Sequence, residues 1–194
     1  LDYFTPQLYW RIASEGQSYP KLLEWWIKQN TKKRHLWPGN FTSQVRRKGD
    51  ETPTRSVWEV DELLNQIKIT RELGAGGNVH FSMKAIMQNY DGLADRLRDG
   101  LYAEPALVPE TPWLGREAPG APKVTAKKSA EGVTVTMNAA RGKAPWQWLV
   151  QVQTKEGWKS LIVPGSETKA VVPVEADAKP QAVVVAGLSR LCKL

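Results

Sequence analysis

The first 102 residues repeat one pattern three times, a short apolar run followed by an amphipathic helical pattern. The predicted strands are residues 1–10, 34–43 and 78–86. The predicted helices are residues 18–30, 56–73 and 90–102. Consecutive strands joined by helices in this way pair in parallel, with the helices as crossovers. The pattern therefore predicts an α/β unit built on three parallel strands.

Local signals mark where these helices begin and which side they bury. Ser18 is a predicted N-cap, with Pro20 in the first turn behind it. Ser56 and Glu59 have the spacing of a capping box, in which each side chain bonds the other's free backbone N–H. The predicted buried stripes are Val60, Leu63, Leu64 and Ile67 in the second helix and Leu93, Leu97 and Leu101 in the third.

Three parallel strands do not make a complete sheet, because a parallel sheet needs both faces and its edges covered. The chain also opens inside the first strand, at Leu1. An eightfold (β/α)8 barrel would supply the missing neighbours, with these units as its strands six to eight. We therefore expect residues 1–115 to be the C-terminal portion of a TIM barrel whose earlier strands lie outside this chain.

A proline-rich segment separates this pattern from a different one. Residues 102–123 hold five prolines and no periodicity, which predicts a linker at 116–121. Short, valine-rich, alternating runs follow at 122–128, 132–138, 147–154, 158–163, 169–174 and 181–188. They predict an all-β domain over 122–194, an immunoglobulin or fibronectin type III-like β-sandwich.

Composition excludes several classes of protein. No apolar run approaches the roughly 20 residues of a membrane span, and these 194 residues contain no signal peptide, so the signal of an exported protein is expected upstream of them. The single cysteine, Cys192, excludes an internal disulfide and a multi-cysteine zinc site. No metal-ligand spacing or phosphate-binding loop is found, so we expect no metal and no cofactor.

Positive charge is concentrated in the second half. Residues 116–194 carry 12 basic and 6 acidic side chains, whereas residues 1–115 carry 15 and 14. The basic residues are spread along the predicted strands, which favours solvated strand faces over a nucleic-acid groove. Nucleic acid is therefore not an expected partner.

Several motifs together resemble a known family. The stretches LDYFTPQLYW, LLEWW, DELLNQIKITREL, GNVHFSMKAI and PALVPETPWL are similar, in this order, to the C-terminal third of the catalytic domain of glycosyl hydrolase-like family 10. The resemblance covers residues 1 to about 115. It implies a (β/α)8 barrel that acts on a polysaccharide or oligosaccharide, with bacterial cell-wall glycan favoured. A fibronectin-like domain follows the barrel in many members.

The resemblance also implies a location. Members of the family are bacterial proteins that are usually exported, as periplasmic, outer-membrane lipoprotein or extracellular proteins. Membrane attachment is then expected only through a lipid anchor upstream of this chain.

The first candidate sugar-binding residues end the first strand. Gln7 offers an amide that can bond vicinal hydroxyls, Tyr9 a phenol, and Trp10 an indole for stacking on a sugar ring. Alternation points Gln7 and Tyr9 to the same side. The alternative is that Tyr9 and Trp10 pack between strands and helices.

Two further clusters fall at the carboxyl ends of predicted strands, where the sites of such barrels lie. Asn40, after Pro38 and Gly39, is a candidate for bonding a hydroxyl or a catalytic carboxylate, or it belongs to a plain turn. Ser82 and Lys84 are expected on one face of the third strand, together with His80. Lys84 could orient a carboxylate or an anionic sugar substituent, while His80 is more typical of a core histidine.

The acids of a glycosidase are missing from these positions. Such enzymes use two carboxyl groups roughly 5–10 Å apart, and none of the three predicted strands ends in Asp or Glu. Glu15, Asp50 and Glu51 lie in the loops and are more typical of solvated side chains. We therefore expect the acid and base to lie outside this segment, so that its catalytic residues are unknown.

Other functions remain open from sequence alone. The long loop at 41–56 resembles a rim or lid, with basic residues typical of exposed loops. A non-catalytic carbohydrate-binding or scaffold protein is the main alternative to a hydrolase. This alternative depends on Trp146, Trp148 and Trp158, which would form a sugar-binding platform if they were exposed and coplanar. We expect at least two of them in the core instead.

Overall fold

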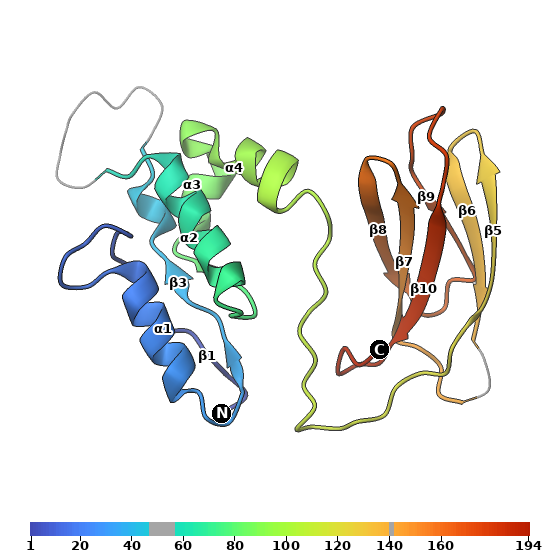
Figure 1. The fold of residues 1–194 in the computed structure, drawn as a ribbon, viewed down its shortest axis with the longest axis horizontal. Helices are drawn as coiled ribbons and strands as arrows, with labels where there is room; N and C mark the ends of the chain where they lie inside the picture. Colours follow the sequence, from blue (N-terminus) through green and yellow to red (C-terminus); the bar gives the residue numbers. More distant parts are fainter. Residues whose placement is uncertain (47–56, 140–141) are drawn as a thin grey trace. The chain divides into compact units, whose positions relative to one another are not determined.

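The computed structural model describes residues 1–46, 57–139 and 142–194 (Figure 1). The chain forms two compact units, Leu1–Ala103 and Glu104–Leu194. The first unit ends before the predicted boundary at residue 115 because the following segment packs on the second unit. The Glu104 carboxylate accepts a bond from the Ser160 N–H at 2.7 Å, and the Thr111 N–H donates to the Leu191 carbonyl at 3.1 Å.

Four very short strands form two two-stranded sheets in the first unit. They are β1 (Tyr3–Phe4), β2 (His35–Leu36), β3 (Gly39–Asn40) and β4 (Val79–His80). β1 pairs with β2 and β3 with β4, both in parallel, and a parallel bridge joins Gln7 to Gly39. The predicted parallel pairing of the three strand regions is confirmed. Proline, which has no N–H to donate, separates β2 from β3 at Pro38 and interrupts the first region at Pro6.

Two helices cover one side of these strands. α1 (Tyr19–Gln29) and α2 (Val60–Glu72) pack against each other and lie alongside the strands (Figure 1). Tyr19 and Leu23 of α1 form a buried core with Leu8 and Leu36. The predicted stripe of α2 is also buried, since Val60, Leu63, Leu64 and Ile67 are all core residues. Apolar periodicity therefore located the helix faces correctly.

The helix starts agree with the sequence-based prediction in part, since Ser18 takes the N-cap position of α1 and Pro20 lies in its first turn. Ser18 does precede α1, but its hydroxyl donates to the Ile12 carbonyl at 2.9 Å rather than capping the helix. The predicted Ser56–Glu59 capping box is wrong. Glu59 itself occupies the N-cap position of α2, without a side-chain cap bond, and Ser56 lies outside the described residues.

The third predicted strand is wrong beyond His80. The chain turns there into the short helix α3 (Met83–Met87), which buries Ala85. The 3-10 turn η2 (Tyr90–Gly92), α4 (Leu93–Arg96) and the π-helical turn η3 (Leu97–Leu101) follow. Leu93 and Leu97 are buried and Leu101 packs against them, so the predicted stripe of this segment is confirmed. The described residues of this unit form no closed barrel.

The second unit consists of two antiparallel sheets. Its strands are β5 (Lys123–Ser129), β6 (Gly132–Asn138), β7 (Gln147–Thr154), β8 (Gly157–Pro164), β9 (Lys169–Val172) and β10 (Ala182–Leu188). The sheet orders are β5-β6-β9 and β10-β7-β8 (Figure 1). Alternate residues of both sheets build one core, with Val135 and Met137 from one sheet and Trp148 and Val150 from the other. Every predicted alternating run thus contributes a strand, while the immunoglobulin or fibronectin type III class stays a prediction.

Candidate functional site

Strand alternation gives the first unit one side that its helices do not cover. Phe4 packs on Trp26 of α1, and Leu8 and Leu36 lie in the helix-side core. The residues between them point the other way because neighbouring strand residues face opposite sides. We call this side the open face; it carries Tyr3, Gln7, Tyr9, His35, Trp37, Phe41 and Phe81.

Three aromatic rings meet at the carboxyl ends of the three strand regions. The Tyr9 ring stacks on Phe41, with centroids 4.8 Å apart, and on Phe81 at 5.8 Å. Phe41 and Phe81 lie 6.1 Å apart, and Phe81 is 53% exposed. Tyr9 belongs to the predicted site, but Phe41 and Phe81 were missed. A signal for them exists, since each is the residue that directly follows the last paired residue of its strand.

A second aromatic group lies at the amino ends of the same strands. The Trp37 ring stacks with Tyr3, at a centroid distance of 5.0 Å, and with His35, at 5.4 Å. Tyr3 and His35 are register partners across β1 and β2, so they stand on the same side of the sheet. The open face is therefore aromatic at both ends.

Gln7 lies between these two groups. Its side chain is exposed and forms no hydrogen bond within the described part of the chain. Its amide is thus available to an incoming hydroxyl or carbonyl group. Trp10 is 37% exposed at the start of the next loop, so exposed Gln7, half-buried Tyr9 and Trp10 lie near one another at the end of the first strand region.

Asn40 has a different environment from these three residues. Its side chain is fully buried and faces the helices. Its Nδ2 donates to Gln66 Oε1 at 2.9 Å, and its Oδ1 accepts from Asn78 Nδ2 at 2.7 Å. The structure therefore does not bring Asn40 together with Gln7 and Tyr9, and it occupies the amide with protein partners instead of a ligand.

The network around Asn40 joins strands to both helices. The Tyr19 hydroxyl of α1 bonds Thr70 of α2 at 2.7 Å and accepts from Asn40 at 3.3 Å. Burial raises the pKa of Tyr19, so the phenol stays protonated and can donate. No side-chain polar atom buried in the described residues lacks a partner.

Gln66 and Glu62 of α2 hold the loop that carries Trp10. Gln66 Nε2 donates to the Trp10 carbonyl at 3.1 Å and to Glu62 Oε1 at 2.9 Å. The same Glu62 oxygen accepts the Ile12 N–H at 2.7 Å. These positioning roles were not predicted, because sequence pattern gives no sign that polar residues of a helix will reach a loop far away in the chain.

The third predicted cluster does not form one strand face. Because the chain turns into α3 after His80, Ser82 takes the N-cap position and Lys84 lies exposed on the helix. Ser82 instead contacts Ser43, whose hydroxyl accepts the Ser82 N–H at 2.9 Å. The prediction that His80, Ser82 and Lys84 alternate on a strand is wrong.

His80 is held between two hydroxyl groups. Its Nδ1 lies 3.1 Å from Thr42 Oγ1 and its Nε2 lies 3.0 Å from the Tyr102 hydroxyl. Burial lowers the pKa of His80 below its ordinary value. A neutral imidazole donates through one nitrogen and accepts through the other, which suits two hydroxyl neighbours.

Within residues 1–46 and 57–103 no acid pair accompanies the open face. The segments that follow the three strand regions, 7–10, 41–44 and 81–84, contain neither Asp nor Glu. Among the described residues, no group of three or more His, Cys, Asp or Glu is placed to hold a metal ion. Glu15 is exposed, and Asp50 and Glu51 lie outside the described residues, as does most of the predicted rim loop. The described face can hold a ligand but offers no acid–base pair.

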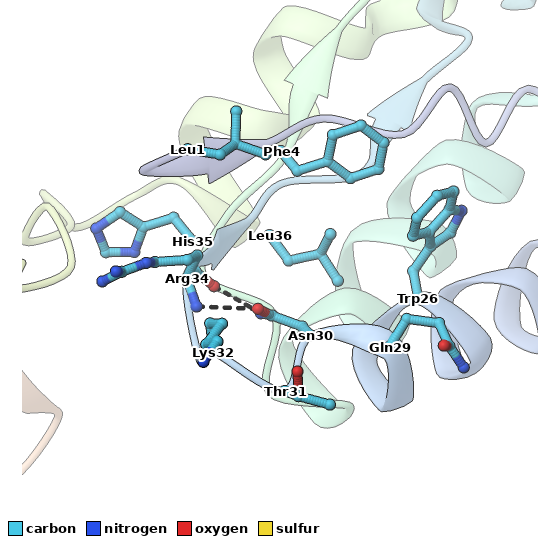
Figure 2. A pocket seen from close by; sticks show the side chains of 10 residues that line it. All are labelled: Leu1, Phe4, Trp26, Gln29, Asn30, Thr31, Lys32, Arg34, His35 and Leu36. Atoms are coloured by element: carbon cyan, nitrogen blue, oxygen red, sulfur yellow. Dashed lines mark hydrogen bonds between the residues drawn. The ribbon is translucent and has the colours of Figure 1, made fainter.

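The first unit also contains a groove away from the carboxyl ends of its strands. A groove of about 680 Å³ runs along the amino ends of β1 and β2 and the end of α1. Figure 2 shows the Phe4 and Trp26 rings beside it, and the Asn30 side chain hydrogen-bonded to the backbone of Arg34. These bonds fix the turn between α1 and β2. In parallel α/β folds the amino ends of strands serve stability, so we do not place the functional site there.

The tryptophans of the second unit also differ from expectation. Trp148 is core, at 1% exposure, but Trp146 and Trp158 are exposed. The expectation that at least two of the three are buried is therefore wrong. Trp158 pairs with Gln153 and Trp146 precedes Gln147, so they stand at opposite ends of β7 and form no shared platform.

Comparison with known proteins adds one relationship. No family model matches the chain. Over 127 residues, or 64% of the chain, it is 36% identical to "Glycosyl hydrolase YngK" of Bacillus subtilis (strain 168). The chain is similar to a glycosyl hydrolase. It spans 24% of the length of that protein.

The relationship agrees with part of the sequence analysis. A glycosyl hydrolase-like protein was predicted from the motifs of residues 1–115, and this similarity supports that level of description. None of the helices in the described residues is long and apolar enough to cross a membrane.

Proposed function

We propose that this chain is part of a glycoside hydrolase-like protein of family 10 type that acts on a polysaccharide. The observation that carries the proposal is the cluster of Tyr9, Phe41 and Phe81 at the carboxyl ends of parallel strands. Aromatic rings pack against the C–H side of sugar rings, and exposed Gln7 can bond their hydroxyls. The similarity to a glycosyl hydrolase supports the same reading.

In this proposal the open face is one part of a larger groove. Residues 1–115 contribute the last strands of a (β/α)8 barrel, and the acid and base come from strands outside them. Segments 7–10, 41–44 and 81–84 contain no Asp or Glu, which supports placing the acid and base on other strands. Bacterial cell-wall glycan as substrate, export of the protein and a fibronectin type III-like second domain belong to the same proposal. Nucleic acid is no part of it.

The same lack of acids favours one alternative. A carbohydrate-binding or scaffold protein would use the aromatic rings to hold a glycan without cutting it. Both proposals predict binding at the open face, and only the first predicts cleavage by the full-length protein.

The test uses the full-length protein with insoluble bacterial cell-wall glycan. Phe81→Ala removes a ring at the carboxyl ends of the strands, so it should lower cleavage about tenfold through lost stacking. Trp25→Ala, which removes a ring 51% exposed on α1, serves as the control and should leave cleavage unchanged.

Two results would change the conclusion. Glycan binding with no release of reducing ends by the unsubstituted protein would leave the non-catalytic alternative. Equal cleavage by the unsubstituted protein and the Phe81→Ala variant would remove the open face from the site.

A further inference from the structure

The second unit contains a hollow of its own, lined by residues of that unit alone. It has a volume of about 600 Å³, within the range of small-ligand sites. Three pieces of chain enclose it: residues 114–117, residues 143–146 and residues 189–191. The first piece is held against the last, since Thr111 bonds Leu191 at 3.1 Å and Glu110 bonds Lys193 at 3.0 Å. These two contacts hold the first and last of the three segments together.

Trp146 is the aromatic residue of this hollow. Its side chain is 52% exposed, but its backbone is fixed by two bonds, from its N–H to Leu188 at 2.7 Å and from the Gly165 N–H to its carbonyl at 2.8 Å. The Arg190 guanidinium lies over the indole, 4.3 Å from the ring centroid. Such a cation–π contact orients the guanidinium and leaves its N–H donors at the edge free for other partners.

The charges around Trp146 are predominantly positive. Arg116, Lys143 and Arg190 line the hollow, with Glu117 as the acid among the lining residues. Glu117 is paired with Lys143 at 2.7 Å. Neither Arg116 nor Arg190 forms an ion pair with a carboxylate in the described part of the chain. Two arginines thus remain for an anionic partner.

We propose that this hollow binds a carboxylated sugar residue of an acidic glycan. A guanidinium presents paired N–H donors that match the two oxygens of a carboxylate, and an indole accepts the apolar side of a sugar ring. A neutral sugar would use Trp146 but leave both arginines without an anion. The lining residues indicate a carboxylated ligand with an apolar face. That this ligand is a saccharide rests on the proposed function.

The test measures binding directly by titration calorimetry with the whole chain of residues 1–194. The ligand is trigalacturonic acid, and its full methyl ester is the neutral control with the same sugar rings. We expect binding of the acid, at least tenfold weaker binding of the ester, and weakening of acid binding as NaCl increases.

Substitutions assign the binding to the hollow. Arg190→Gln and Arg116→Gln should each weaken acid binding about tenfold, the value of one charge-assisted bond. Trp146→Ala should weaken the binding of both the acid and the ester. Trp158→Ala and Lys155→Gln, which change an exposed tryptophan and an exposed lysine elsewhere on the same unit, should change nothing. The Arg116→Gln variant retains Trp146, so it still tests the site if Trp146→Ala disturbs the fold.

Several outcomes would overturn the inference. They are no detectable binding, equal affinity for acid and ester, unchanged affinity in both arginine variants, or tighter binding of a single-stranded oligonucleotide of equal charge. None of these depends on cleavage, so failure here and failure of the proposed function give separate results.

Discussion

At the scale of single residues, hydrogen-bond partners separate ligand-binding groups from structural ones. Asn40 and Gln7 are both amides near strand ends, and both were predicted to bind substrate. Asn40 is enclosed by Gln66, Asn78 and Tyr19, whereas Gln7 is exposed. Residue type and spacing are the same for a buried and an open amide, so the sequence could not distinguish them. The partners of Asn40 come from three separate elements, which only the folded chain brings together.

We predict that Asn40→Ala lowers the free energy of unfolding of the first unit by about 1–3 kcal/mol. The reason is that Asn78 and Gln66 would each lose a buried partner. Urea titration measures the free energy of unfolding, and amide hydrogen exchange in α1 and α2 locates the loss in the first unit. Asn65→Ala, at an exposed position of α2, is the matched control. Equal loss in both variants would mean that the network contributes nothing specific.

His80 gives a prediction for pH. Burial lowers its pKa in the folded state below the ordinary value of 6.5. As the pH falls below about 6.5, the unfolded state binds a proton that the folded state does not, so the free energy of unfolding decreases. Above about pH 6.5 His80 no longer lowers the free energy of unfolding. Below that pH, His80 makes the free energy of unfolding fall by at most about 1.4 kcal/mol per pH unit.

The measurement compares unfolding free energies between pH 5 and pH 8 for the unsubstituted chain and His80→Gln. The glutamine retains a donor and an acceptor but does not titrate. We expect a shallower pH dependence in the variant. Identical slopes would show that His80 titrates alike in the folded and unfolded states.

At the scale of elements, the spacing of apolar residues correctly predicted which helix faces are buried and where the strands of the second unit lie. The stripes of α2 and of residues 93–101 are buried as predicted, and each alternating run of the second unit forms a strand. The error at residues 81–86 has a physical cause. NVHFSMKAI alternates polar and apolar residues as a strand does, but Ala85 and Ile86 pack against the α2 core in helical geometry. In a segment this short, tertiary packing outweighs the local pattern.

Two glycines of the second unit make an element-level prediction. Gly132 and Gly157 both have positive φ, 137° and 126°. A Cβ on Gly132 would collide with the Val172 carbonyl across β6 and β9, whereas a Cβ on Gly157 would meet open space. We expect Gly157→Ala to cost about 1–2 kcal/mol and Gly132→Ala about 2 kcal/mol more.

Thermal unfolding of the two alanine variants measures this difference. The melting temperature of Gly132→Ala should be clearly lower. If both variants melt together, the backbone between β6 and β9 can move apart at little cost.

At the scale of the whole molecule, the open face has aromatic rings and an exposed amide, and the described residues give it no acid pair. We predict that the chain of residues 1–194 binds cell-wall glycan and releases no reducing ends, while the full-length protein releases them. The reason is that segments 7–10, 41–44 and 81–84 contain no carboxylic acid. A reducing-end assay measures this, with the full-length protein as the positive control. Turnover by residues 1–194 alone would contradict the assignment of acid and base to other strands.

The alternation of the first strand region also limits how its length can change. Phe4 and Leu8 contact the helix layer, and Tyr3, Gln7 and Tyr9 lie opposite. One residue inserted between Phe4 and Gln7 would move Gln7 and Tyr9 into the core and Leu8 into solvent. Two inserted residues would restore the sides but displace Tyr9 from Phe41 and Phe81. Insertions and deletions among homologues should therefore collect after Trp10, where the strand has ended and the rings are already placed.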